Sequence, residues 1–273
     1  MKKGVLDLAI RRERGVIVLK KYLFVLAIFV MMFPGLTGWV NPVQASTEYA
    51  GEGKKESKPV TIYLVRHGKT ILNNTDRAQG WIDAPLIPSG EEKIKETGKR
   101  LAHIPFVGAY SSDSGRAIKT AKLILGENQT TAKSLPVLLN KNLREAYFGS
   151  FEGEKMNVLW KETAKYLGFS SREELFASNG NPYEKLVNAL SELDPSKEAE
   201  NYQMLKDRAF KAITEIAEKT YQKGGGDLLV VSHGITMNAI LDQIDKNKVP
   251  KGLFANGTVM KLEFNGKDWK VAE

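Results

Sequence analysis

The sequence predicts a three-layer α/β/α fold built on a mainly parallel sheet. From residue 59 onward, short apolar runs alternate with segments of helical periodicity, and this alternation is typical of parallel strands joined by helical connections. The chain has 273 residues, of which 42% are hydrophobic and 26% are charged. Such a composition can fill one sizeable core, and it excludes disordered chains, collagen and disulfide-stapled miniproteins.

The expected strands are short apolar runs bounded by turn or helix signals. The runs at 60–65 and 227–232 are the clearest, because most residues in each are apolar. Asn265 and Gly266 separate two further runs and are a hairpin signal. We therefore expect strands at 60–65, 106–110, 136–139, 227–232, 258–264 and 268–271.

The expected helices carry apolar residues at helical spacing, at 89–102, 114–125, 202–221 and 234–244. The first of them opens with an acidic turn, and the second ends at Gly126, as helix termini commonly do. Residues 59–273 are expected to form one domain. Within it, residues 151–205 are expected to be a helical insertion over the ligand-binding edge of the sheet.

Residues 1–45 predict a secretory signal peptide. Basic residues precede the apolar run 22–33, a Pro-Gly break follows it, and Ala45 stands at the expected cleavage position. We therefore expect a secreted or extracytoplasmic protein. The alternative is an uncleaved membrane anchor, since the apolar stretch can be extended to Val40 and about 20 residues span a bilayer. Small and charged residues at 46–58 predict a flexible linker.

The formal net charge of +8 does not predict a nucleic-acid-binding protein. Residues 1–45 hold seven of the 40 Lys and Arg residues and two of the 32 acidic ones, so the rest of the chain is nearly balanced. The absence of cysteine excludes disulfide frameworks, thiolate metal sites and a cysteine nucleophile. A histidine-rich metal centre is not expected either, because histidine occurs only as His67, His103 and His233.

Two of the three histidines directly follow an expected strand. His67 lies in Arg66-His67-Gly68, after the strand at 60–65, and His233 lies in Ser-His-Gly after the strand at 227–232. Because ligands bind at the carboxyl ends of strands in open α/β sheets, we expect both side chains in one crevice. His103, near the end of a helix, is expected at the surface.

Several segments continue this pattern along 60–273. The element at 66–73 reads Arg-His-Gly-Lys-Thr-Ile-Leu-Asn, and four more segments follow it in order, at 79–86, 111–121, 143–153 and 232–234. Together they resemble the histidine phosphatase superfamily, also called the phosphoglycerate mutase-like family, whose first element is Arg-His-Gly-x-Thr-x-x-Asn. Two positions depart from its common pattern: Lys69, where Glu or Gln is frequent, and Ser114, where a larger apolar residue is usual.

The resemblance implies a phosphoryl-transfer site that needs no metal or other cofactor. His67 would be the nucleophile that forms a phosphohistidine, and Arg66 and Arg116 would clamp the phosphoryl oxygens. His233 would stabilise the transition state, while Glu145 would protonate the leaving group and then activate water. Further substrate contacts are expected from Asn73, Gln79, Gly80 and Gly234.

Some assignments have alternatives. Glu152 and Glu154 lie close to Glu145 and could replace it as the proton donor. Lys69 would add positive charge near the mouth of the site and bias it toward anionic substrates. Aromatic residues of the insertion are expected mostly in the core, with one or more lining the pocket: Trp160, Tyr166, Phe169, Phe176 and Tyr183.

The predicted function is hydrolysis of a small-molecule phosphomonoester. An export signal argues against a glycolytic mutase, whose substrate and priming bisphosphate occur in the cytoplasm. Phe148 also stands where the family's mutases carry a tyrosine before the glycine. The alternatives are phosphoglycerate mutase-type phosphotransfer, a phosphodiesterase or phosphoprotein phosphatase, and a non-catalytic surface or binding protein on the same fold. The sequence leaves the substrate and the oligomeric state open.

Overall fold

The computed structural model describes residues 57–272. The predicted signal peptide at 1–45 and nearly all of the predicted linker at 46–58 lie outside the described residues. Among the residues that are described, no helix is both long and apolar enough to cross a membrane.

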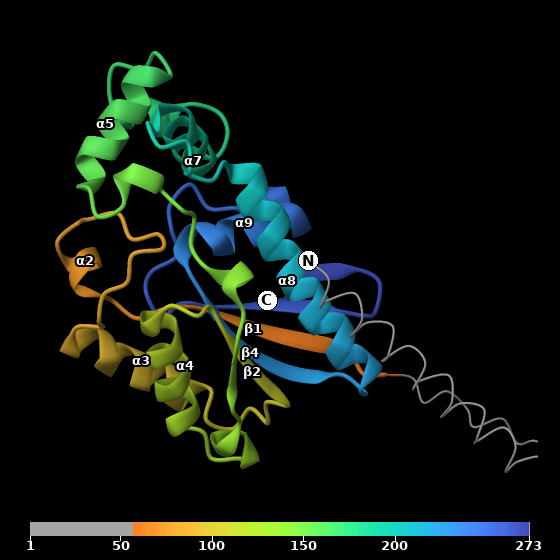
Figure 1. Ribbon diagram of the computed structural model, residues 1–273. Helices are drawn as coiled ribbons and strands as arrows, with labels where there is room; N and C mark the ends of the chain where they lie inside the picture. The colour runs from red at the N-terminus through yellow and green to blue at the C-terminus, as the bar shows by residue number, and fades with distance from the viewer. Residues whose placement is uncertain (1–56, 273) are drawn as a thin grey trace, which may run out of the picture. The chain divides into compact units, whose positions relative to one another are not determined.

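The described chain folds around one six-stranded sheet with the strand order β3-β2-β4-β1-β5-β6 (Figure 1). The four strands β1 to β4 run parallel, and β5 and β6 form an antiparallel extension at one side. Their bounds are β1 Val60–Arg66, β2 Gly108–Ser111, β3 Val137–Leu139, β4 Gly226–Ser232, β5 Val259–Phe264 and β6 Trp269–Val271. The α/β fold with a mainly parallel sheet is therefore confirmed.

Side chains alternate between the two faces of the sheet along each strand. Apolar residues point to both faces here, and helices cover both. Ile62 and Leu64 of β1 pack in one cluster with α8 (Tyr202–Gln222) and α9 (Gly234–Ile244). Val65 of the same strand packs in another cluster with α3 (Pro88–Arg100) and α4 (Gly115–Gly126). The two clusters make the three layers that the sequence predicts.

Two details differ from the sequence prediction. The second strand begins at Gly108 rather than at residue 106, since Phe106 is buried by packing edge-on against the Tyr63 ring, 5.5 Å away, and not by strand pairing. A four-residue helix, α2 (Ile71–Asn74), follows β1 and was not expected. It is too short to show a period, and it is held by a capping box between Thr70 and Asn73.

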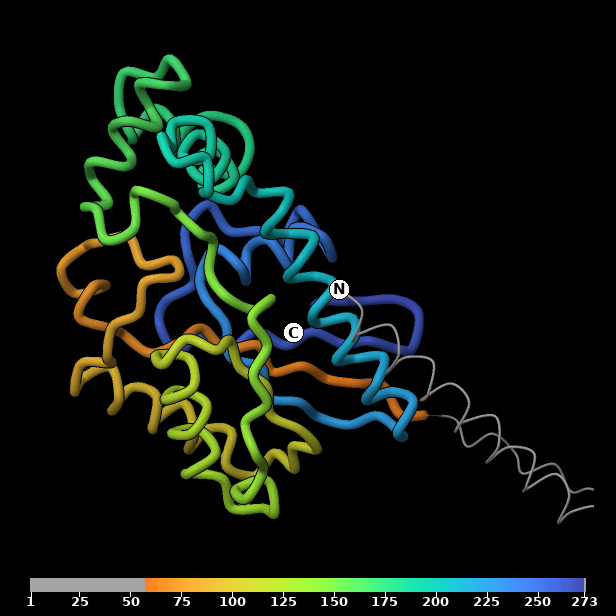
Figure 2. Tube along the Cα trace, in the orientation of Figure 1, coloured from red at the N-terminus to blue at the C-terminus, as the bar shows by residue number. Residues whose placement is uncertain are grey.

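The helices α5 (Met156–Tyr166), α6 (Arg172–Ala177) and α7 (Pro182–Leu193) form a cap within the segment predicted as an insertion. Their apolar faces share one buried cluster, which also takes in Ile235 and Ala239 of α9. Residues 76–78 and 154–156 run side by side, because the Ala78 N–H donates to Glu154 and the Met156 N–H donates to Asp76 (Figure 2). These contacts place the cap above the carboxyl ends of β1 and β4.

The remaining short elements are 3₁₀ turns: η1 Thr131–Ser134, η2 Lys141–Leu143, η3 Gly149–Phe151 and η4 Lys246–Lys248. The third of them is anchored to the cap by the buried Asp194 carboxylate, which accepts from the N–H groups of Ser150 and Ala199. Burial alone would raise the pKa of Asp194, but its many hydrogen bonds lower it far below the ordinary value.

Candidate active site

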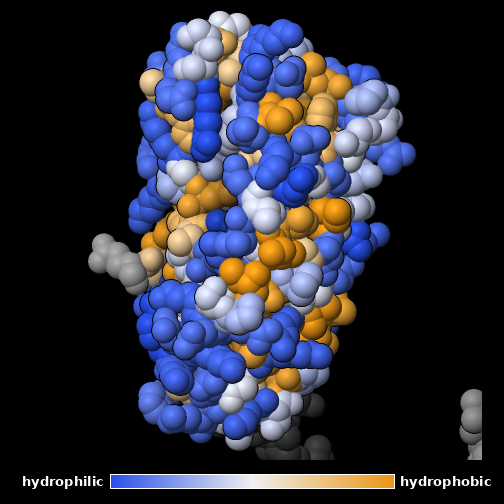
Figure 3. Space-filling view, turned by 90° about the vertical axis from the view of Figure 1, so that its left-hand side faces the viewer, coloured by the Kyte–Doolittle hydropathy of each residue, from blue (hydrophilic) through white to orange (hydrophobic). Residues whose placement is uncertain are grey.

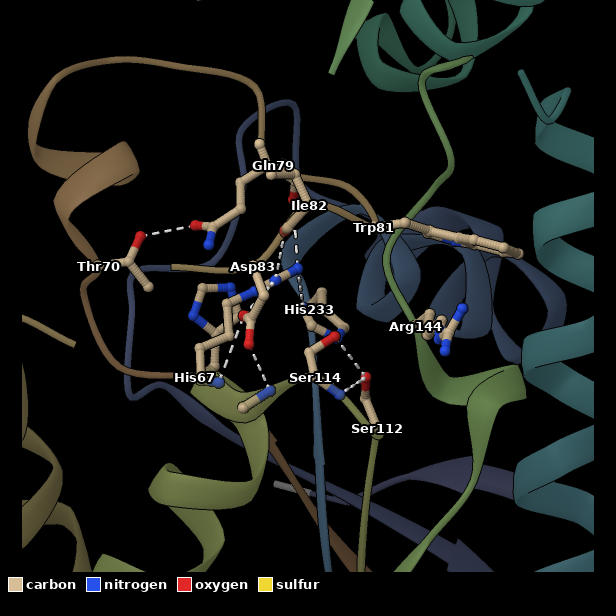
Figure 4. A network of polar contacts seen from close by, with 12 residues as sticks. His67, Thr70, Gln79, Trp81, Ile82, Asp83, Ser112, Ser114, Arg144 and His233 are labelled. Carbon is tan, nitrogen blue, oxygen red and sulfur yellow. Dashed lines mark hydrogen bonds and ion pairs between the residues drawn. The ribbon is translucent and has the colours of Figure 1, made fainter. Parts of the chain in front are cut away.

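The two predicted histidines meet at the carboxyl edge of the sheet. Arg66 and Ser232 are register partners at the ends of β1 and β4, and the His67 N–H donates to the Ser232 carbonyl over 3.0 Å. The imidazole rings of His67 and His233 lie with centroids 5.1 Å apart (Figure 4). Both side chains are buried, so the fold brings them into one crevice, as the sequence predicts.

The hydrogen bond of His67 decides which ring nitrogen can react. Its Nδ1 lies 2.8 Å from the Gly68 carbonyl oxygen, and a carbonyl can only accept, so Nδ1 carries the proton. Nε2 is left with its lone pair. Burial and the positive charges of Arg116 and Arg66 hold the pKa of His67 well below its ordinary value. The ring is therefore neutral, which is the nucleophilic form.

His233 adopts the opposite tautomer. Its Nδ1 lies 3.1 Å from Nη2 of Arg116, and a guanidinium can only donate, so Nδ1 accepts and Nε2 carries the proton. Burial, Arg116 and His67 lower the pKa of His233 well below its ordinary value. His233 thus presents a neutral N–H donor where His67 presents a lone pair.

Four buried nitrogens at this edge have no hydrogen-bond partner within the described part of the chain. A buried donor left unpaired costs about 1–3 kcal/mol, so four in one place call for a ligand with several acceptor oxygens. All four belong to residues singled out by the sequence, namely Arg66 Nε, Gln79 Nε2, Arg116 Nε and His233 Nε2. A tetrahedral oxyanion matches this donor set.

Arg116 is fully buried, and most of its guanidinium is already engaged. Nη1 donates to Asp83 Oδ1 over 2.9 Å and to the Ile82 carbonyl over 3.0 Å, and Nη2 donates to the Gly80 carbonyl over 2.7 Å. Only Nε remains. Within residues 57–272, Nε is thus the buried guanidinium nitrogen of Arg116 that is left without a partner.

Gly80 lies behind Arg116 and does not line the cavity. Its carbonyl accepts from Arg116, and its N–H donates to Glu152 over 3.0 Å. A Cβ at this position would come within 2.2 Å of the Ala146 carbonyl oxygen. The glycine is thus required by the close approach of two backbones, and Gly80 is not among the residues that line the cavity.

Glu145 lines the same cavity as His67 and, unlike the other lining acid Asp76, is buried. Its carboxylate accepts from the N–H groups of Ile235 (3.0 Å) and Thr236 (2.9 Å) in the first turn of α9. The two alternatives are placed elsewhere: Glu152 is bound by four backbone N–H groups of the 80–82 and 148 segments, and Glu154 is exposed. Geometry therefore favours Glu145 among the three.

An ion pair between half-buried Arg208 and buried Glu200 holds the backbone of Glu145 in place. Arg208 donates from Nη2 to the Glu145 carbonyl over 2.7 Å and from Nε to the Glu200 carboxylate over 2.6 Å. Glu200 also accepts from the Tyr147 N–H. This pair is not predictable from the sequence, because an Arg on a helix and a Glu in the loop before it are usually surface residues.

Asn73 and Gly234 complete the predicted set. The Asn73 side chain lines the cavity and accepts from Nδ2 of Asn256, which also donates to the His67 carbonyl over 2.9 Å. Gly234 opens α9, and a Cβ there would lie 3.2 Å from Nε of Arg66. Asn256 is not predicted as a site residue from the sequence, since a lone Asn-Gly before a strand indicates a turn.

The cavity at this edge has a volume of about 250 Å³. Phe148, Trp160 and Tyr183 form part of its apolar wall, so two of the aromatic residues of the insertion line it; Tyr166, Phe169 and Phe176 do not. Its charged lining residues are Arg66, Lys69, Asp76, Arg77, Glu145 and Arg172. His103 is exposed and does not line the cavity.

Among residues 57–272, no three His, Asp or Glu side chains gather in a way that could hold a metal ion. The groups assembled at the cavity include a neutral imidazole lone pair, several N–H donors and the carboxylates of Glu145 and Asp76. This set can attack a phosphorus atom, stabilise its oxygens and move a proton.

Comparisons with known proteins also indicate phosphoryl-transfer chemistry. The family model described as histidine phosphatase superfamily (branch 1) matches residues 62–273. A 2,3-bisphosphoglycerate-dependent phosphoglycerate mutase 2 from Gloeobacter violaceus is 30% identical, over 67% of this chain and 75% of its own length. A metal-independent phosphoserine phosphatase from Arabidopsis thaliana is 27% identical, over 85% and 88%. The crystal structure of a phosphoglycerate mutase from Bacillus anthracis has 38% identity and a TM-score of 0.75, covering 80% of this chain and 93% of that one.

Proposed function

The chain belongs to branch 1 of the histidine phosphatase superfamily, and we propose that it hydrolyses phosphomonoesters through a phosphohistidine on His67. The observation that carries this proposal is the lone pair on Nε2 of neutral His67 beside four buried N–H donors that have no partner among residues 57–272. A phosphoryl group bound there would satisfy the donors and stand within reach of the lone pair.

In the first step, Nε2 of His67 attacks phosphorus while the bond to the leaving oxygen breaks. The charge on the equatorial oxygens is met by N–H groups of Arg66, Gln79, Arg116 and His233. His67 does not have to lose a proton before it attacks, because its ring proton is on Nδ1, in the hydrogen bond to the Gly68 carbonyl, and Nε2 is unprotonated. The product is a phosphoramidate on Nε2.

Glu145 serves the proton transfers of both steps. Protonated, it gives its proton to the departing alkoxide; ionised, it takes a proton from the water that attacks phosphohistidine and regenerates His67. The N–H groups of Ile235 and Thr236 fix both of its oxygens at the wall of the cavity. The same carboxylate can thus act on the leaving group and on the water that replaces it.

Mutase-type transfer is the second candidate, because the similar proteins include both mutases and a phosphatase. The two reactions share the phosphohistidine and differ in whether water or a second hydroxyl accepts the phosphoryl group. Phe148, whose buried ring lines the cavity, supports hydrolysis, since the family's mutases carry a tyrosine there. A purely binding protein is disfavoured, because both histidines, both arginines and the acid are all in place.

The test is phosphate release by the full chain from 4-nitrophenyl phosphate in excess chelator, beside the reaction with 3-phosphoglycerate. Hydrolysis predicts free phosphate from the aryl ester that is lost in a His67→Ala variant. Conversion of 3-phosphoglycerate to 2-phosphoglycerate with no phosphate release would establish the mutase instead.

Export remains part of the proposal and rests on residues 1–45. Their basic start, apolar run and Ala45 support cleavage before Ser46. The N-terminal sequence of protein recovered from the culture medium of an expressing bacterium tests it, with Ser46 as the expected first residue. An intact N-terminus in the membrane fraction would establish the anchored alternative.

A further inference from the structure

Thr70 belongs to the sequence element at 66–73, but the reaction proposed above gives it no task. Its side chain is fully buried, and it does not line the cavity of His67. The helix α2, which follows it, lies at the surface, where Ile71 is 44% exposed. Figure 3 shows this face of the molecule, on which apolar side chains interrupt a mostly hydrophilic surface. A hydroxyl buried beneath such a surface needs its hydrogen-bond partners inside the protein.

The backbone of Thr70 is held by the segment that leads into α3. Thr70 and Leu86 form an antiparallel bridge. Beside it, the Ile87 N–H donates to the Lys69 carbonyl over 2.9 Å. The side chain of Thr70 therefore starts from a fixed position.

The Thr70 hydroxyl has one proton to donate, and that proton goes to Gln79. Its Oγ1 accepts from the Asn73 N–H over 3.1 Å, which makes Thr70 the N-cap of α2. It donates to Oε1 of Gln79 over 2.6 Å (Figure 4). Within the described part of the chain, Oε1 of Gln79 is the only acceptor that this proton has. Since the amide nitrogen can only donate, the contact places the oxygen of the Gln79 amide, and not its nitrogen, on the side of Thr70.

With its oxygen held by Thr70, the Gln79 amide turns its nitrogen the other way. Nε2 is buried and has no partner among residues 57–272, and Gln79 lines the cavity of His67. The backbone carbonyl of Gln79 accepts from Nη2 of Arg116 over 3.3 Å. Gln79 is thus held at its backbone and at the oxygen of its side chain, and Nε2 is the group left to bind a ligand.

Resting on the phosphoryl-transfer reaction proposed above, we propose that Thr70 is a positioning residue, which holds the Gln79 amide so that Nε2 donates to a phosphoryl oxygen. It acts through Gln79 and does not touch the substrate. The reverse orientation of the amide would turn Oε1, which can only accept, toward oxygens that carry negative charge. Loss of the Thr70 hydroxyl therefore frees the amide to turn over, which removes a donor from the site and adds a repulsion.

The experiment measures the binding of inorganic phosphate to the full chain by calorimetry. Thr70→Val keeps the branched shape of the side chain and removes its hydroxyl, so we expect Kd to rise about tenfold. Thr70→Ser, which keeps the hydroxyl, should bind as the natural chain does. Thr97→Val is the matched control, because Thr97 is equally buried, donates to the Gly257 carbonyl over 3.1 Å and does not line the cavity. It should leave Kd unchanged.

A double-mutant cycle with Gln79→Met separates the positioning of the amide from the capping of α2. Thr70→Val also removes the acceptor of the Asn73 N–H, and a loss of binding by that route would persist when the amide is absent. If Thr70 acts through the amide, adding Thr70→Val to Gln79→Met should change Kd by less than about twofold. The value of kcat/KM for 4-nitrophenyl phosphate should follow the same pattern.

The inference would be overturned by an unchanged Kd in Thr70→Val, by an equal loss in Thr97→Val, or by a loss that Thr70→Ser shares. A loss of the same size in the Gln79→Met background would also overturn it, as would a natural chain that binds no phosphate. Because phosphate binding needs no turnover, it tests Thr70 separately from the reaction. Absence of turnover and of phosphohistidine, with the binding pattern intact, would refute the proposed function alone.

A second measurement covers a Thr70→Val variant that does not fold. Nuclear magnetic resonance of the natural chain detects the side-chain amide protons of Gln79, which are assigned by their absence in Gln79→Met. These signals should shift when phosphate is added, because Nε2 donates to the ligand. Signals that stay in place in the phosphate-bound protein would refute the proposed orientation of the amide, and with it the task given to Thr70.

Discussion

Arg116 donates from Nη2 to Nδ1 of His233 across 3.1 Å, and this contact fixes which nitrogen of His233 holds its proton. The same guanidinium is anchored by Asp83 and by the carbonyls of Ile82 and Gly80. The loop of residues 79–83 therefore orients Arg116 and, through it, the neighbouring histidine.

Asp83 should act as a positioning residue for Arg116. An Asp83→Asn variant keeps the carbonyl partners of Arg116 but loses its charged one, so we expect kcat/KM to fall about tenfold. Asp113→Asn is the matched control, because Asp113 also pairs with an arginine, Arg144, through two contacts of 2.6 Å. Rescue of kcat by the conservative Asp83→Glu would support positioning, whereas equal effects of Asp83→Asn and Asp113→Asn would count against it.

Glu145 should matter most for substrates with poor leaving groups. A Glu145→Gln variant keeps the size of the side chain but cannot transfer a proton, so kcat for an alkyl phosphate should fall about 10²- to 10⁴-fold. The first step with 4-nitrophenyl phosphate should be affected much less, since nitrophenolate leaves without a proton. Burst-phase kinetics separate the two steps. A similar loss for both leaving groups would contradict the assignment.

Stability should fall in mild acid because of the two site histidines. Burial, as the first cause, lowers the pKa of both His67 and His233 well below the ordinary value. In the unfolded chain they take up protons near pH 6.5, about the ordinary pKa of histidine, while the folded protein keeps them neutral. Their contribution to the free energy of unfolding is thus fully present above that pH and declines as the pH falls toward the folded pKa.

Urea denaturation at about pH 7.5 and about pH 5 measures this loss of stability. A His67→Asn variant should show a smaller difference between the two pH values than the natural chain. His103→Asn, which removes the exposed histidine, should keep the difference. An unchanged pH dependence in His67→Asn would contradict the buried neutral state of the ring.

Gly80 should tolerate no side chain, although it does not line the cavity. A Cβ there would lie 2.2 Å from both the Ala146 carbonyl oxygen and Glu152 Oε1, so Gly80→Ala must shift the 79–83 loop and Arg116 with it. We expect at least about a tenfold loss of kcat/KM and lower thermal stability. Gly126→Ala is the control, since a Cβ at Gly126 meets nothing within 4 Å. Equal behaviour of the two variants would refute this account of Gly80.

The sequence predicts most of the sheet because the buried strands β1 and β4 are nearly continuous apolar runs. It also predicts the meeting of His67 and His233, since both follow parallel strands. It could not predict α2, which is shorter than a helical period, or the start of β2, because Phe106 is apolar for packing rather than for strand pairing.

Within the site, residue types pointed to the groups but not to their partners. Arg116 matched a motif, yet its binding to Asp83 and three backbone carbonyls depends on how the 79–83 loop folds back. Glu145 could be separated from Glu152 only by seeing which carboxylate the 80–82 N–H groups bind. Long-range loop contacts of this kind leave no local pattern in the sequence.

The most direct test of the account is the trapping of the phosphoenzyme. Full-length Glu145→Gln is mixed with 4-nitrophenyl phosphate, quenched under alkaline denaturing conditions and mapped by mass spectrometry, because loss of the base should slow hydrolysis of the intermediate. We predict one phosphoryl group on His67, none on His233, and none in a His67→Asn background. Turnover without any phosphohistidine, or a phosphoryl group on another residue, would contradict the central claim.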